Sequence, residues 1–157
     1  MKAYIATHFF DLFGFEGTKR LAKRLRKEFP DIEFYVPQEN GEINDKKNND
    51  DKITDIAIYE ADTKELLSSQ ILIAYLDGVE IDSGVACEIG LFIGVMETLK
   101  QLNIKHTPKL VLGLYTDMRQ YGTGDNHMYR NLFVKGGINK WGKVVSSENE
   151  LVDEIRN

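Results

Sequence analysis

The chain has 157 residues, of which 42% are hydrophobic and 29% are charged, and its formal net charge is -5. This length and composition are typical of one globular domain, so we expect residues 1–157 to form a single domain. The negative net charge argues against a nucleic-acid partner, because phosphate binding needs a clustered basic surface. The one cysteine, Cys87, excludes an internal disulfide and favours a reducing compartment.

No segment has the pattern of a secretory signal or a membrane span. Residues 1–6 turn polar too soon for a signal peptide. Charged residues interrupt every apolar stretch before it could cross a bilayer. We therefore expect a cytoplasmic protein that does not insert into membranes.

Short strand-like segments and amphipathic helical segments alternate along the chain. Four apolar segments rich in β-branched or aromatic residues are predicted to be strands: 2–6, 33–36, 71–76 and 110–115. Helical periodicity predicts helices over 18–29, 51–61, 84–102 and 148–156. A further short helix is predicted to begin at Asp62, because Asp62-Thr63-Lys64-Glu65 has the form of an N-cap with an acid three positions on.

This alternation predicts parallel βαβ units. We expect an α/β fold, a flavodoxin-like doubly wound sandwich with a central, mostly parallel five-stranded sheet, since the chain is short for a full dinucleotide-binding fold. Two connections, 38–51 and 117–137, are predicted to be long loops. Loops of this length within a compact domain are often functional.

Ligands of open α/β sheets bind beyond the carboxyl ends of the strands. The residues that follow the predicted strands are rich in carboxylates and aromatics: Thr7, His8, Phe9, Phe10, Pro37, Gln38, Glu39, Asn40, Asp77, Gly78, Glu80, Asp82, Thr116, Asp117 and Arg119. The glycine-rich motifs of triphosphate-binding and dinucleotide-binding loops are absent. The three histidines lack a second ligand at metal spacing, so no metal site is predicted. With these site types excluded, the carboxylates are the remaining candidates for catalytic chemistry.

Glu88 falls in the first turn or two of the helix predicted over 84–102. It shares a helix face with Val85, Leu91 and Phe92. Burying a glutamate on such a face is costly without a partner or a task. The helix dipole near an N-terminus favours the ionised form, which a nucleophile needs. Taken alone, the position is better interpreted as an exposed complement to the dipole.

Five segments together resemble the nucleoside 2-deoxyribosyltransferase family. ILIAYLDG at 71–78, followed by DSGVACEIG at 82–90, is similar to the family's buried strand ending in Asp-Gly and its D-x-G-[TS]-A-x-E-[IL]-G motif. YIATHFF at 4–10 resembles the opening strand, and IYEAD at 58–62 resembles the segment carrying an acid before the third strand. NLF at 131–133 resembles the element that reaches a neighbouring subunit's site. The resemblance extends over most of the chain.

The resemblance implies three catalytic residues. Glu88 would be the nucleophile, Tyr4 would orient it, and Asp62 would handle the proton of the base. From the residues alone, Tyr4 could equally be a core aromatic, and Asp62 could be only an N-cap.

The resemblance also implies substrate-binding residues. Asp82 would hold the 5′-hydroxyl of the sugar, helped by Asn131 from a partner subunit. Phe10 would line the base pocket and Phe133 would close it across the interface, so a homo-oligomer with shared active sites, a dimer or a hexamer, is expected. Asp77, the aspartate of the Asp-Gly pair, is a further candidate. Asp82 could instead cap the Glu88 helix, and Asn131 could satisfy loop backbone.

Two departures from the family pattern lie near the implied site: the first would reshape the base pocket, and the second removes a hydroxyl near the nucleophile. Thr7-His8 stands where the family often has Gly-Pro, and Val85 stands where it often has Thr. Base preference therefore stays open. Cys87 is expected to be a small buried side chain.

The implied activity is transfer of a 2-deoxyribosyl group between bases by retaining double displacement, with 2′-deoxynucleosides and free nucleobases as substrates and no cofactor. The alternative is hydrolysis of 2′-deoxynucleoside 5′-monophosphates. Relatives with that activity carry Ser at the position of Asp82, whereas an aspartate repels a phosphate and accepts from a hydroxyl. A third hypothesis, a non-catalytic binding module, would be favoured if Glu88 pointed into solvent, away from Tyr4 and Asp82.

Overall fold

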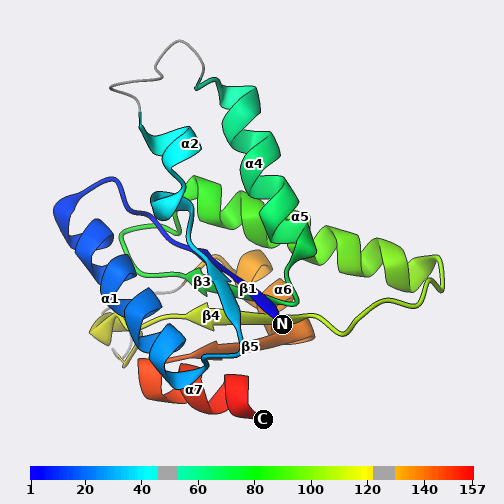
Figure 1. Cartoon of the computed structure of the whole chain (residues 1–157). Coiled ribbons are helices and arrows are strands. Elements are labelled where there is room, and N and C mark those ends of the chain that lie inside the picture. The colour runs from blue at the N-terminus through cyan, green and yellow to red at the C-terminus, as the bar shows by residue number, and fades with distance from the viewer. Residues whose placement is uncertain (46–52, 122–129) are drawn as a thin grey trace.

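The computed structural model describes residues 1–45, 53–121 and 130–157, and its centre is a five-stranded sheet (Figure 1). The strands are β1 (Lys2–Ala6), β2 (Glu33–Tyr35), β3 (Ile71–Tyr75), β4 (Leu110–Leu114) and β5 (Gly142–Val145). Their order is β2-β1-β3-β4-β5, and each of the four pairings is parallel. The predicted flavodoxin-like α/β fold is confirmed, with a sheet that is wholly rather than mostly parallel.

Helices cover both faces of this sheet (Figure 1). The helices are α1 (Leu12–Glu28), η1 (Pro37–Glu39), α2 (Gly41–Asn44), α4 (Asp55–Ser68), α5 (Ser83–Gln101), η2 (Met118–Tyr121), α6 (Leu132–Trp141) and α7 (Glu148–Arg156). One core lies between the sheet and α1 with α7, and the other lies between the sheet and α4, α5 and α6. Because side chains alternate along a strand, Ala3 and Ile5 enter the first core while Tyr4 and Ala6 enter the second. No helix within the described ranges has the length and hydropathy to span a bilayer.

The N-cap predicted at Asp62 is wrong. A single helix, α4, runs through this position and begins after Thr54, whose side chain accepts a hydrogen bond from the Ala57 amide at 3.1 Å. The Asp62 carboxylate accepts instead from the hydroxyl of Tyr35 on β2. A capping pattern begins a new helix only where the preceding helix has ended, and α4 instead continues through Asp62, with contacts to β1 and α5.

The loop predicted over 117–137 is also wrong in part. Its described residues include η2 and the first turns of α6. The fifth strand, β5, follows α6 directly and was missing from the predicted strands. Its four residues carry only two large apolar side chains, Val144 and Val145, which is too weak a pattern to detect. In the connection over 38–51, η1 and α2 form short helices, and residues 46–52 lie outside the described residues.

The close packing of Gly142, at the junction between α6 and β5, can be tested by substitution. A Cβ atom on Gly142 would lie 1.8 Å from the backbone oxygen of Val111, whereas one on Gly136 would meet no atom within 4 Å. We expect Gly142→Ala to destabilise the protein by about 1–3 kcal/mol or more through overpacking. Gly136→Ala, inside α6, should stabilise it by up to about 1 kcal/mol through helix propensity. Urea unfolding midpoints measure both, and equal shifts would contradict the packing at Gly142.

Candidate active site

Asp82 sets the beginning of α5 and thereby the place of Glu88. Its Oδ1 atom accepts hydrogen bonds from the amides of Gly84 at 2.9 Å and Val85 at 3.1 Å. The capping role considered for Asp82 is therefore present. The second carboxylate oxygen is left for other partners, so capping does not exclude substrate binding.

Tyr4 brings its hydroxyl to Glu88 from the neighbouring strand. Its ring is completely buried in the core on the α5 face, and the hydroxyl donates a hydrogen bond to Glu88 Oε1. Tyr4 is thus both a core aromatic and a partner of the carboxylate. Glu88 does not point freely into solvent, which removes the observation that would have favoured a non-catalytic module.

A second tyrosine–carboxylate pair lies beside the first. Tyr35 donates from its hydroxyl to Asp62 Oδ1 at 2.9 Å. The rings of Tyr4 and Tyr35 pack with their centroids 5.4 Å apart. The sheet and helices therefore bring Glu88 and Asp62, distant in sequence, to one place.

Glu88 and Asp62 line two adjoining cavities, of about 340 Å³ and about 380 Å³. The smaller is lined by Thr7, Phe9, Phe10, Pro37, Ile43, Asn44, Ile58, Asp62, Asp82, Ser83, Gly84, Val85 and Glu88. The larger, between α4 and α5, is lined by Asp55, Ile58, Tyr59, Asp62, Thr63, Leu66, Gly84, Cys87, Glu88 and Leu91. Cavities of this size are typical of small-ligand sites.

The cavity environment changes the acidity of both carboxyl groups. Burial raises the pKa of Glu88 to about 7, and the nearby charges of Asp62 and Asp82 add to the effect, while the Tyr4 hydrogen bond opposes it. Burial also raises the pKa of Asp62, and the Tyr35 hydrogen bond opposes that shift. Two acids with raised pKa values in one cavity are an arrangement suited to acid–base and nucleophilic chemistry.

Asp77 is not among the residues that line these cavities. Its Oδ1 accepts from the amides of Thr116 at 2.7 Å and Asp117 at 2.9 Å, and its Oδ2 accepts from the Thr116 hydroxyl. The carboxylate thus ties the end of β3 to the end of β4. A direct substrate contact for Asp77 stays a prediction that this geometry does not favour.

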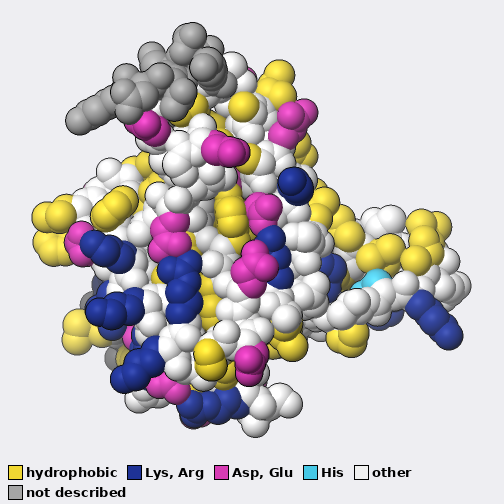
Figure 2. All heavy atoms as spheres, in the orientation of Figure 1, with side chains coloured by type: hydrophobic (Ala, Val, Ile, Leu, Met, Phe, Trp, Pro, Cys, Tyr) yellow, Lys and Arg dark blue, Asp and Glu magenta, His cyan; other side chains and the backbone are white. Residues whose placement is uncertain are grey.

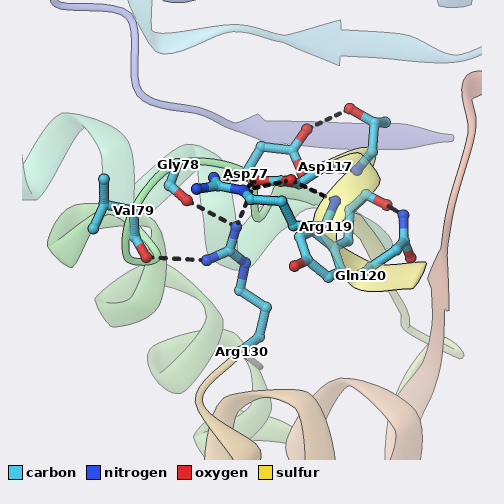
Figure 3. A network of polar contacts seen from close by, with 9 residues as sticks. Asp77, Gly78, Val79, Asp117, Arg119, Gln120 and Arg130 are labelled. Carbon is cyan, nitrogen blue, oxygen red and sulfur yellow. Dashed lines mark hydrogen bonds and ion pairs between the residues drawn. The ribbon is translucent and has the colours of Figure 1, made fainter. Parts of the chain in front are cut away.

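Arg130 completes the same network (Figure 3). Its buried guanidinium donates to the carbonyl oxygens of Gly78 at 2.8 Å and Val79 at 3.1 Å. It also lies 4.5 Å from the centroid of the Tyr115 ring and 3.5 Å from a carboxylate oxygen of Asp117. Gly78 has a φ of 122°, a conformation that favours glycine, so the turn presents its carbonyl at little strain. Arg130 therefore holds the turn that leads from β3 to Asp82.

The sequence profile of the nucleoside 2-deoxyribosyltransferase family matches residues 3–153. The chain belongs to this family. Family members include both transferases and N-glycosidases, so these enzymes share cleavage of an N-glycosyl bond. A search of curated proteins finds no significantly similar sequence.

Solved structures share the fold of this chain. A conserved protein from Enterococcus faecalis V583 is 34% identical, with a TM-score of 0.79 over 99% of this chain and 97% of that one. A 2-deoxyribosyltransferase from Bacillus psychrosaccharolyticus is 14% identical, with a TM-score of 0.66 over 98% and 91%. A CMP N-glycosidase from Clostridium botulinum is 14% identical, with a TM-score of 0.55 over 99% and 98%. The last two likenesses show the shared fold alone.

The remaining family-motif residues lie at the surface. Asn131 caps α6 by accepting from the amides of Phe133 at 3.0 Å and Val134 at 3.2 Å. Phe133 is 92% exposed, and neither Asn131 nor Phe133 lines the cavities at Glu88 of the same chain. Phe10 does line the smaller cavity although it is 83% exposed, and it stacks on Phe9 with centroids 5.0 Å apart. Hydrophobic side chains gather at the surface over the start of α1, at the left edge of Figure 2.

The expectation that Cys87 is buried is wrong. Its side chain is exposed and lines the larger cavity, because this side of α5 faces the groove toward α4 rather than the sheet. Val85, the departure from the family's Thr, is instead buried in the core. Among the residues that the structure describes, no group of three or more His, Cys, Asp and Glu side chains is arranged around a metal position.

The raised pKa of Glu88 predicts a pH-dependent stability. Its folded-state pKa of about 7 lies above the ordinary value of 4.5, so between these values the folded protein holds a proton that the unfolded chain releases. Stability from this group is complete below pH 4.5 and is lost as the pH rises through 7. We expect Glu88→Gln, a neutral isostere, to stabilise the protein by about 1–3 kcal/mol at pH 8.

The same substitution should have little effect at about pH 3.5, where this side chain is protonated in both the folded and the unfolded chain. Urea unfolding at the two pH values checks this, with Glu60→Gln on the exposed side of α4 as the matched control. A loss of stability at pH 8 would contradict the environment assigned to Glu88.

Proposed function

We propose that the protein is a nucleoside 2-deoxyribosyltransferase that uses Glu88 as its covalent nucleophile. One observation carries this proposal: the Tyr4 hydroxyl donates a hydrogen bond to the Glu88 carboxylate, and Glu88 lines a cavity together with Asp62 and Asp82. These residues stand in the segments that resemble the family's motifs. The activity needs neither a metal nor an organic cofactor, and the substrates are 2′-deoxynucleosides and free nucleobases.

The first half of the reaction forms a glycosyl ester. A Glu88 carboxylate oxygen bonds to C1′ of the sugar while the C1′–N bond breaks and its electron pair passes to the base. Protonated Asp62 gives its proton to the departing base. The positive end of the α5 dipole and the Tyr4 hydroxyl stabilise the ionised nucleophile before attack.

The second half reverses these steps with another base. A nitrogen of the incoming base attacks C1′ from the face that the first base left, the ester bond breaks, and Asp62 takes up the proton that the new base loses. Two inversions give overall retention at C1′. Water entering in place of the base would give hydrolysis, so slow release of free sugar is compatible with transfer.

Charge in the smaller cavity favours a nucleoside over a nucleotide. Glu88, Asp62 and Asp82 all line it, and a phosphate dianion there would be repelled. The free oxygen of Asp82 can accept a hydrogen bond from a neutral 5′-hydroxyl. The hydrolysis of 2′-deoxynucleoside 5′-monophosphates is therefore the alternative that the test below must separate.

The decisive test is exchange of bases. The protein is incubated with a 2′-deoxynucleoside and a different free base, and the new nucleoside is followed by chromatography. We expect exchange in the wild type and none in Glu88→Ala, since removal of the nucleophile removes the covalent route. Mass spectrometry of a quenched reaction should find a deoxyribosyl group attached to Glu88. Base released from the 5′-monophosphate, with no exchange from the nucleoside, would establish the hydrolase instead.

Asn131 and Phe133 extend the proposal to a homo-oligomer. Their exposure, together with their absence from the cavities of their own chain, fits residues that complete the site of a second subunit. In a dimer of this kind each active site combines Glu88 of one subunit with Asn131 of the other. We propose that the protein forms such shared sites and that it acts in the cytoplasm.

Mixing two inactive variants tests the shared site. Glu88→Gln and Asn131→Ala are each expected to lose most activity, but a mixed dimer contains one site with both residues intact. Unfolding and refolding the two together should therefore restore about a quarter of the wild-type activity in a dimer. Asn131→Asp keeps the cap and separates capping from substrate contact. Full activity at concentrations where the protein is a monomer would contradict the shared site.

A further inference from the structure

We propose that Tyr35 is the positioning residue of Asp62: it holds one carboxylate oxygen of Asp62 and leaves the other to exchange a proton with the base. This inference deepens the proposed function and rests on it. Neither the sequence motifs nor the family match assigns a role to Tyr35.

The direction of the Tyr35–Asp62 hydrogen bond is fixed by a third residue. Asn40 caps α2, and its Oδ1 accepts from the amide of Glu42 at 3.1 Å. The Nδ2 group of Asn40 therefore turns toward Tyr35 and donates to its hydroxyl oxygen at 3.0 Å. Because the Tyr35 hydroxyl oxygen accepts from Asn40, the single hydrogen of this hydroxyl points to Asp62 Oδ1.

Backbone register places Tyr35 where this bond can form. Tyr4 and Tyr35 are direct partners in the parallel pairing of β1 with β2. Their side chains therefore leave the sheet on the same face, toward α4 and α5, and each hydroxyl meets one carboxylate. The α2 helix that carries the Asn40 cap packs against α4, which carries Asp62 (Figure 1). Tyr35 thus relates to Asp62 as Tyr4 relates to Glu88.

In this proposal, Asp62 uses Oδ2 to exchange a proton with the base. Within the described part of the chain, Tyr35 is its hydrogen-bond partner at Oδ1, and the side chain lines both cavities beside Glu88. When the C1′–N bond breaks, the electron pair goes to the base and the proton on Oδ2 follows it. Asp62 is then a carboxylate whose Oδ1 still accepts from Tyr35 and whose Oδ2 accepts the proton of the incoming base. The hydrogen bond to Oδ1 also makes the acid a better donor, since it stabilises the ionised form.

A pair of substrates that differ in their need for a proton tests this role. 2′-Deoxyguanosine loses its base with a proton from an acid, whereas 7-methyl-2′-deoxyguanosine carries a positive charge and leaves as a neutral base without one. We expect Tyr35→Phe to lower kcat about tenfold for 2′-deoxyguanosine and less than about twofold for the methylated substrate, with KM changed little in both cases. The phenylalanine retains the ring packed on Tyr4, so the fold should be preserved.

Tyr75→Phe is the matched control. Tyr75 is also a partly buried strand tyrosine, but its ring lies in the other core and packs on His8 at 5.4 Å. Its loss should leave the ratio of the two rates unchanged. In an Asp62→Asn background, Tyr35→Phe should cause no further loss. Equal loss on both substrates, or no loss on either, would overturn the proposal.

A measurement without turnover separates this inference from the proposed function. Titration of the Asp62 side-chain carbon by NMR should give a higher pKa in Tyr35→Phe than in the wild type, and an unchanged one in Tyr75→Phe. An unchanged pKa in Tyr35→Phe would reject the role of Tyr35 even if transfer occurs. Absence of base exchange in the wild type would reject the proposed function, and the titration would still decide whether Tyr35 controls Asp62.

Discussion

One buried carboxylate constrains the rest of the site. Glu88 lies on α5 among residues that enter the core, including Val85, Ile89 and Phe92. Holding an ionised carboxylate in such surroundings costs several kcal/mol unless donors replace the lost water. The Tyr4 hydroxyl donates a hydrogen bond to the ionised form, and the N-terminal end of α5 supplies a positive potential that favours it. The burial of Glu88 and the charge of Asp62 favour the protonated form. The balance gives Glu88 a pKa of about 7, so that near neutral pH a substantial fraction is in the ionised form that the proposed nucleophile needs.

The carboxyl edge of the sheet is organised to hold this balance. Asp82 fixes where α5 begins, and Arg130 fixes the Gly78 turn that precedes it. Asp77 joins β3 to β4 beneath that turn. These three contacts can affect the site without touching a substrate. A small displacement of α5 would move Glu88 away from the Tyr4 hydroxyl. Under the proposed function, these contacts at the strand ends would act indirectly, by keeping α5 and therefore Glu88 in position.

The sequence named several carboxylates and a tyrosine that the fold brings together, but it predicted the local structure around them less well. Glu88 and Asp82 lie within one short motif, where local spacing already brings a cap and a carboxylate to the same helix end. Asp62 was found as a candidate, but its local pattern suggested a helix start that packing of α4 overrides. The role proposed for Tyr35 has no local sequence signal, because its contact with Asp62 depends on which strand lies beside β1 and in which register. Such pairings across the sheet become visible only once the strand order is known.

The two tyrosines also bear on which carboxyl group holds the proton. The charge of Asp62 is among the causes that raise the pKa of Glu88, so ionisation of the one carboxyl group opposes ionisation of the other. Each tyrosine favours the ionised form of its own partner, so the tyrosines alone do not assign that proton. In the proposed mechanism, a base nitrogen facing Asp62 Oδ2 would break this symmetry, since it accepts a hydrogen bond only from the protonated acid. Under the proposed function, binding of the substrate would then draw the proton to Asp62 and leave Glu88 ionised against C1′, the arrangement that the proposed first step needs.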